Sequence, residues 1–229
     1  MRTPLSIIYS DEHLLIADKP AGLLTVAGPD EGASLESVLE EQGSRAKAVH
    51  RLDRDVSGCV LCARDPKIQA QLEDLFRERQ LEKTYWALAA GHVEPAAGQW
   101  KFPLLQERGM ARVSARGLPS TTVYRTLARH ALVSELEITL VTGRYNQIRV
   151  HAAHVGHALC GERKYARGKD DPLRAPRIAL HAWRLEFTHP ATGQVVRASA
   201  LLPAELELLR ETAAKVQLAK KPRFESPGS

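Results

Sequence analysis

The chain has 229 residues, of which 44% are hydrophobic and 26% charged, with a formal net charge of +5. This balance is typical of a globular protein with a sizeable core and excludes a disordered or fibrous chain. Because no apolar run is long enough to cross a membrane and charges interrupt the N-terminal apolar stretches, we expect a soluble, cytoplasmic protein without a signal peptide.

Basic residues are concentrated in two parts of the chain. Residues 140–184 contain nine Lys or Arg and three Asp or Glu, and residues 215–229 contain four basic residues and one acid. Residues 30–41, by contrast, contain five acids and no base. Such asymmetry favours one face that binds a polyanion.

The first part of the chain predicts two strands, a bend and a helix. Residues 7–9 and 14–17 alternate as strands do, and the sequence K-P-A-G at 19–22 forces the chain to turn. Ser34 can cap a short helix over residues 35–40, whose apolar positions repeat at helical spacing.

The apolar run at 59–63 predicts a buried strand that contains two of the three cysteines. Cys59 and Cys62 form a C-x-x-C pattern, so a thiol redox protein or a zinc site is an alternative. Side chains three apart in a strand point to opposite faces, and no second cysteine pair completes a zinc site. His151, His154 and His157 spread around a helix instead of converging. We therefore expect inert thiols and no metal site.

The rest of the chain predicts strands that single helices interrupt. Asp65 and Pro66 open a helix, Asn146 is placed to cap a short helix with Arg149 beside its apolar stripe, and a last helix follows Pro203. The predicted strands are residues 83–93, 121–129, 132–141, 181–188 and 194–201. Because no regular β-α-β rhythm emerges, we predict the α+β class.

Several stretches carry candidate chemistry. In chain order they are DKPAGLLT at 18–25, HRLDRDVSG at 50–58, EKTYWALAAG at 82–91, TGRYNQIRVHAAHVGHALCGERKY at 142–165 and LHAWRLEFTHPATG at 180–193. This series resembles the RluA family of RNA pseudouridine synthases from about residue 7 to residue 203. The resemblance implies a mixed, largely antiparallel sheet with a central active-site cleft and flanking helices.

The resemblance also implies roles for individual residues. The catalytic aspartate of the family falls on Asp53, the aromatic residue of its K-x-Y motif on Tyr85, and the basic residue that pairs with the aspartate on Arg149. The residues expected to bind the substrate are Arg51, Arg54 and Ile148.

This chain departs from the family pattern at two positions. Val56 stands where the family usually has Thr, and Asn146 stands where it usually has His. Neither position is one of the three expected catalytic residues, so the expected activity is unaffected, although contacts with RNA near them can differ.

The chemistry that the resemblance implies needs few groups. Pseudouridylation breaks a glycosidic C–N bond, turns the freed uracil and rejoins it through carbon. A carboxylate can stabilise or capture the oxocarbenium-like sugar, and the permanently charged guanidinium of Arg149 favours the charged form of Asp53. No motif for a nucleotide cofactor or metal occurs, so we expect a cofactor-free isomerase.

We expect one catalytic domain over residues 1–214, without a preceding RNA-binding domain, and a basic, disordered tail over residues 215–229. The expected partner is ribosomal or transfer RNA, with no obligate protein partner. A catalytically silent RNA-binding protein of the same fold remains the alternative, against which the joint presence of Asp53, Tyr85 and Arg149 argues.

Overall fold

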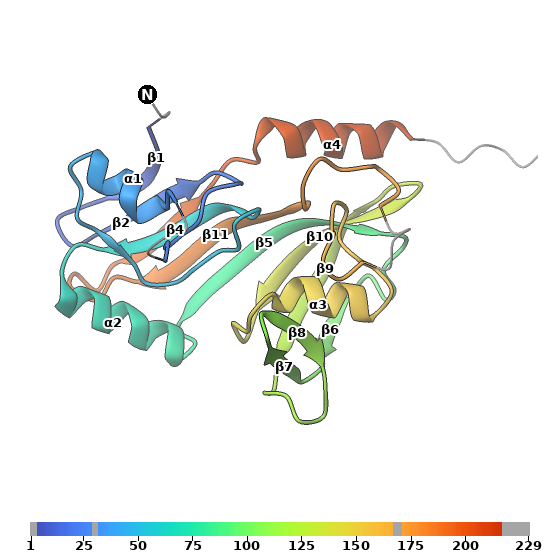
Figure 1. The fold of residues 1–229 in the computed structure, drawn as a ribbon, viewed down its shortest axis with the longest axis horizontal. Coiled ribbons are helices and arrows are strands. Elements are labelled where there is room, and N and C mark those ends of the chain that lie inside the picture. Colours follow the sequence, from blue (N-terminus) through green and yellow to red (C-terminus); the bar gives the residue numbers. More distant parts are fainter. Residues whose placement is uncertain (1–3, 29–31, 167–170, 217–229) are drawn as a thin grey trace, which may run out of the picture.

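The computed structural model describes residues 4–28, 32–166 and 171–216. Within these ranges the chain forms a large mixed sheet, a separate two-stranded ladder and four helices (Figure 1). The helices are α1 (Leu35–Glu41), α2 (Pro66–Arg77), α3 (Gln147–His154) and α4 (Ala204–Lys215). The strands are β1 (Ser6–Ser10), β2 (Leu14–Lys19), β3 (Lys47–Ala48), β4 (Ser57–Ala63), β5 (Leu81–Ala90), β6 (Ala97–Lys101), β7 (Leu104–Glu107), β8 (Met110–Val113), β9 (Thr121–Arg129), β10 (Val133–Leu140), β11 (Leu180–Thr188) and β12 (Val195–Ser199).

The large sheet has the strand order β1-β2-β4-β11-β5-β10-β9-β6, with β3 paired to β4 and β12 paired to β11. Among these pairs, only β4 and β11 run parallel, and they pair at just two positions, Ser57 with His181 and Gly58 with Ala182. This short contact joins the half of the sheet that contains β1, β2 and β4 to the half that contains β5, β9 and β10 (Figure 1).

Both faces of the central strands are buried, and successive side chains enter different cores. Val60 and Cys62 of β4 belong to the core that also contains side chains of α1 and α3. Cys59 and Leu61 belong to a core on the opposite face that contains side chains of α2. Helix α4 packs on that opposite face. Its Leu206 belongs to a third core, which also contains the β5 side chains that point to this face. Burial on both faces explains why residues 59–63 read as a continuous apolar run.

The sequence predicts the main elements well. The α+β class, the strands near 7–9, 14–17, 83–93, 121–129, 132–141, 181–188 and 194–201, and all four helices are confirmed, with ends that differ by up to three residues. Ser34 caps α1 through its side chain, as predicted. Helix α2 begins at Pro66, as predicted, and the side chain of Asp65 caps it. The separation of Cys59 and Cys62 onto opposite faces is also confirmed.

Other predictions are incomplete or untested. The short strands β3, β6, β7 and β8 were not predicted from the sequence. Most of the predicted tail, from residue 217 onward, lies outside the described residues. None of the helices in the described ranges has the length and apolar character that a bilayer crossing requires.

The contact between the two halves of the sheet leads to a prediction about Gly58. Its φ is +114°, and a Cβ atom built there would lie 2.2 Å from the backbone oxygen of Ala182. We expect Gly58→Ala to lower the free energy of unfolding by about 3 kcal/mol or more, because strain and a backbone clash add together. Urea denaturation at 25 °C measures this loss.

Gly43 provides the matched control. It follows α1 with a φ of +82°, and a Cβ atom there would meet nothing within 4 Å. Gly43→Ala is therefore expected to cost only about 1 kcal/mol, from the left-handed backbone alone. Equal losses in the two variants would show that the close approach of β4 to β11 is unimportant for stability.

Candidate active site

A cleft of about 1370 Å³ opens between the loop that precedes β4 and the segment that begins α3. Five of the six residues singled out from the sequence line this cleft, namely Arg51, Asp53, Tyr85, Ile148 and Arg149. The sixth, Arg54, is exposed, and its Nε donates a hydrogen bond to the backbone oxygen of Gly22 at 3.0 Å. The fold thus gathers residues that are up to 98 positions apart in the sequence.

The loop that carries Asp53 is held by the N-terminal motif. Lys19 is fully buried, and its ammonium group donates to the backbone oxygen of Arg54 at 3.1 Å and to two carbonyls of the bend that follows it. The hydroxyl of Thr25 donates to the backbone oxygen of Leu52 and accepts from its N–H. These bonds satisfy the backbone on both sides of Asp53, so the position of this residue is fixed without using its carboxylate.

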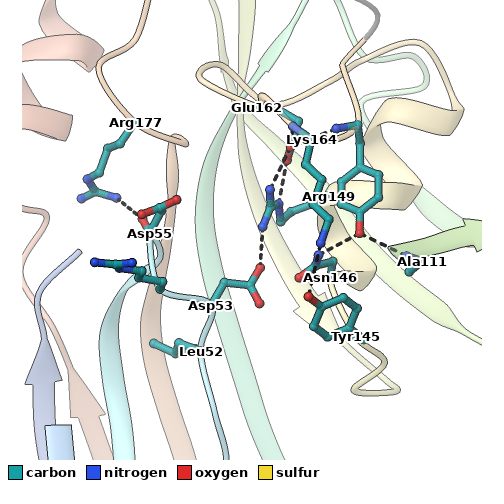
Figure 2. Close-up of polar contacts among 12 residues, drawn as sticks. Leu52, Asp53, Asp55, Ala111, Tyr145, Asn146, Arg149, Glu162, Lys164 and Arg177 are labelled. Atoms are coloured by element: carbon teal, nitrogen blue, oxygen red, sulfur yellow. Dashed lines mark hydrogen bonds and ion pairs between the residues drawn. The ribbon is translucent and has the colours of Figure 1, made fainter. Parts of the chain in front are cut away.

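Arg149 connects two carboxylates through separate edges of its guanidinium (Figure 2). Its Nη1 donates to Oδ2 of Asp53 at 2.8 Å, while Nε and Nη2 donate to the two oxygens of Glu162 at 2.7 and 2.9 Å. The Glu162 side chain is 0% exposed, that of Arg149 is 14% exposed and that of Asp53 is 24% exposed. The buried carboxylate therefore holds the guanidinium in place, and the guanidinium faces the carboxylate that the cleft reaches.

The electrostatics of this group keep Arg149 and Glu162 charged. Burial opposes ionisation of Glu162, but hydrogen bonds and charge from Arg149, together with the N–H groups of Lys164 and Tyr165, outweigh it and lower the pKa of Glu162. Burial likewise opposes the charge on Arg149, yet Glu162 and Asp53 raise the pKa of Arg149 above its ordinary value. Asp53 consequently faces a fixed, permanent cation.

Glu162 was not predicted from the sequence as a site residue. It lies 13 positions after Arg149, in a stretch where basic residues outnumber acids. Its oxygen Oε1 also accepts from the N–H groups of Lys164 and Tyr165, at 2.7 and 3.1 Å. An isolated acid within a basic stretch was the available signal, because a buried acid among arginines needs a partner.

The prediction that Asn146 caps α3 through its side chain is wrong. Asn146 does begin this helix, but its φ is +51° and its side chain makes no hydrogen bond with the first turn. An N-cap side chain needs an extended backbone to reach the free N–H groups. Gln147 stabilises this turn instead, since its Oε1 accepts from the N–H of Arg144 and from the hydroxyl of Thr142.

Tyr85 and Ile148 supply apolar walls of the cleft. Both are buried in the core, Tyr85 on β5 and Ile148 in the first turn of α3. Burial, with a smaller contribution from the charge of Asp53, raises the pKa of Tyr85 above its ordinary value, so this phenol stays neutral. Val56, one of the two departures from the family pattern, is buried in the same core, where an apolar side chain suits its surroundings.

The cysteines lack the properties of reactive thiols. Cys59, Cys62 and Cys160 are all buried, and burial raises the pKa of each to about 12. Reactive thiols are exposed and have a lowered pKa. Nothing in the surroundings of these residues favours the alternative of a thiol redox protein.

Comparisons with known proteins agree on one family. A family profile described as RNA pseudouridylate synthase matches residues 13–154. The ribosomal large subunit pseudouridine synthase D of Nitrosomonas europaea is 38% identical over 223 residues, which cover 90% of this chain and 64% of that protein. The dual-specificity RNA pseudouridine synthase RluA of Pasteurella multocida is 36% identical, over 86% of this chain and 92% of that protein.

A solved structure has the same fold. The human RNA pseudouridylate synthase domain containing 4 superposes with a TM-score of 0.77 at 21% identity, covering 93% of this chain and 94% of that one. This similarity confirms the predicted fold, a mixed and largely antiparallel sheet with flanking helices.

The burial of Glu162 predicts how stability depends on pH. Because the pKa of Glu162 lies below its ordinary value of 4.5, its ionised form stabilises the fold above that pH, and this contribution is lost as the pH falls through the folded-state value. Glu162→Gln should cost about 3 kcal/mol at pH 7, since Arg149 loses its buried partner. The variant should also show a shallower loss of stability between about pH 5 and pH 3.

Urea denaturation at a series of pH values measures both effects, and Glu211→Gln serves as the control. Glu211 pairs with Lys215 on the surface of α4, where its side chain is 52% exposed. Its replacement is expected to change stability by less than about 0.5 kcal/mol. An unchanged pH slope in Glu162→Gln would contradict the assignment of Glu162 as the buried anion.

Proposed function

Because the chain belongs to the RNA pseudouridylate synthase family, we propose that it isomerises selected uridines of structured RNA to pseudouridine, with Asp53 as the reacting carboxylate and no cofactor. The observation that carries this proposal is the contact between Asp53 and Arg149 at the wall of a wide cleft. The contact presents a carboxylate beside a fixed cation, in a place that a nucleotide turned out of its RNA can enter.

The chemistry that we propose needs one carboxylate. The bond between N1 of uracil and C1′ of ribose breaks, and positive charge develops on the sugar. Asp53 stabilises or captures this sugar carbon, as carboxylates do in glycoside hydrolysis. The freed uracil turns and carbon C5 bonds to C1′. Where Asp53 has bonded to C1′, that bond breaks in the same step and returns its electron pair to the carboxylate. The proton that C5 loses is balanced by the one that N1 gains.

The other predicted residues have surroundings that suit their proposed roles. Tyr85 offers an aromatic surface beside Asp53, against which a flat uracil can pack. Ile148 adds apolar surface to the same cleft. Arg51 and Arg54 are exposed at the loop of Asp53, where guanidinium groups can reach RNA phosphates or stack on bases.

The proposed substrate is ribosomal or transfer RNA. One relative is named for the large ribosomal subunit and another for dual specificity, so the relatives themselves differ in substrate. The nine basic residues among residues 140–184 favour a polyanionic partner. We propose the cytoplasm as the site of action, since ribosomal and transfer RNA function there.

The first test compares RNA from cells with and without this gene. Pseudouridine mapping should reveal sites that depend on the gene, and the purified chain should restore them in RNA from the deletion strain. Asp53→Asn should abolish this restoration while retaining the fold and most RNA affinity, because an amide cannot act as a nucleophile. Circular dichroism and a filter-binding assay measure the two retained properties.

Asp55→Asn is the matched control for this test. Asp55 lies two positions away, is exposed, and undergoes the same loss of charge. Near-normal activity in Asp55→Asn with none in Asp53→Asn supports the proposal. RNA binding by the wild-type chain without any gene-dependent pseudouridine would favour a catalytically silent RNA-binding protein instead.

A further prediction concerns the contact between Arg149 and Asp53. Replacing Arg149 with Met removes the guanidinium and keeps apolar bulk, so Asp53 loses the donor that fixes one of its oxygens. The single-turnover rate at pH 7 is then expected to fall about 100-fold, as for a misplaced reacting group. The enzyme is used at saturating concentration, so a change in RNA affinity does not alter the measured rate.

A double variant guards against misfolding in this experiment. Arg149→Met alone leaves Glu162 buried without its partner, which can cost about 3–5 kcal/mol. Adding Glu162→Gln removes that charge, and the amide oxygen can still accept the N–H groups of Lys164 and Tyr165. A double variant that reacts as fast as wild type would show that the contact between Arg149 and Asp53 is unimportant for the reaction.

A further inference from the structure

The single asparagine of the chain, Asn146, lies at the start of α3 and near Asp53 (Figure 2). Its side chain lies within hydrogen-bond distance of both Asp53 and Tyr165. It is 8% exposed, and its left-handed backbone is one that asparagine tolerates better than most residues. Because its side chain makes no bond with the helix, the amide is free to act elsewhere.

The hydrogen bonds around Tyr165 determine which end of the Asn146 amide faces Asp53. The N–H of Ala111, on β8, donates to the hydroxyl oxygen of Tyr165 at 3.2 Å, so the hydroxyl proton is available for another acceptor. The amide oxygen of Asn146 accepts that proton at 2.8 Å. The amide nitrogen then lies 2.8 Å from Oδ1 and 2.7 Å from Oδ2 of Asp53.

The opposite orientation of the amide is excluded by the chemistry of its neighbours. It would set the amide oxygen of Asn146 against an ionised carboxylate, which can only accept hydrogen bonds. It would also leave the hydroxyl proton of Tyr165 without this acceptor. Both ends of the amide therefore favour the orientation in which Asn146 donates to Asp53.

We propose that Asn146 is a positioning residue, which holds the Asp53 carboxylate in the orientation from which it attacks or stabilises the sugar. The terminal torsion of an aspartate is broad, so a single donor leaves the plane of the carboxylate loosely defined. Arg149 bonds one oxygen of Asp53, and Asn146 reaches both. The inference rests on the proposed function. It gives Asp53 a second donor, the neutral amide of Asn146, in addition to the charged guanidinium of Arg149.

Two variants test this proposal in the single-turnover assay with RNA from the deletion strain. Asn146→Gly removes the amide and tolerates the left-handed backbone, so misfolding is avoided. We expect its rate to fall about 10- to 100-fold, as for a misplaced reacting group, with RNA affinity within about twofold of wild type. Thermal unfolding checks that the fold is retained.

Asn146→Asp gives the readout that a merely structural role would not change. Above neutral pH the introduced carboxylate repels Asp53 and cannot donate, so the rate should be low. Two facing carboxylates share one proton on acidification, and this shared proton restores a hydrogen bond between the two side chains. The rate of this variant is therefore expected to rise from pH 8 to pH 6, where the rate of wild type does not.

Gln99→Glu is the charge-matched control, since Gln99 lies exposed on β6 and outside the cleft. It should keep the rate and pH profile of wild type. Wild-type rates in Asn146→Gly, or a pH profile of Asn146→Asp that parallels wild type, would overturn the inference about Asn146 alone. An inactive wild-type chain would overturn the proposed function and, with it, this inference.

Discussion

One guanidinium placed between two carboxylates is the interaction on which the site depends. Glu162 is fully buried and never meets solvent, whereas Asp53 retains access to the cleft. With one cation and two anions, the group keeps a net negative charge at its exposed end. RNA must therefore approach an anion, and Arg51, Lys83 and Arg144 line the same cleft and offset this repulsion. Burial lowers the pKa of Lys83 to about 8, closer to neutral pH than that of an ordinary lysine. The protonation of Lys83 is therefore more sensitive to its surroundings than that of the arginines, which stay charged.

The sheet supports this group by keeping its two sides on separate elements. Asp53 belongs to a loop held by Lys19 and Thr25, while Arg149 belongs to a helix packed on the other half of the sheet. The backbone beside Asp53 and the guanidinium of Arg149 each have hydrogen bonds that do not involve the contact between these two residues. The geometry of the site is consequently set by rigid backbone on both sides, which suits the proposed role of Asp53.

The strands, the helices and the five predicted residues that line the cleft could be found from the sequence, because local pattern and motif order determine them. Alternation and apolar runs reflect burial, which acts on each strand separately. The contact of Asn146 with Asp53 joins residues distant in the sequence, so no local spacing reveals it. Glu162 offered only the hint of an acid among basic residues, because its burial against Arg149 is set by the tertiary fold. The missed strands β7 and β8 are four residues each, too short for periodicity, although Arg108 and Gly109, both with positive φ, form the tight turn between them.

The brief parallel contact between β4 and β11 has a consequence for biogenesis. It joins residues that are 124 positions apart, as the hydrogen bond between Ser57 and His181 illustrates. Arg149 reaches Asp53 across 96 positions. Closing such long loops carries an entropic cost that no local propensity offsets. A chain still emerging from the ribosome thus displays the HRLDRDVSG loop well before its guanidinium partner exists, and the cleft is completed only when β11 has been inserted between β4 and β5.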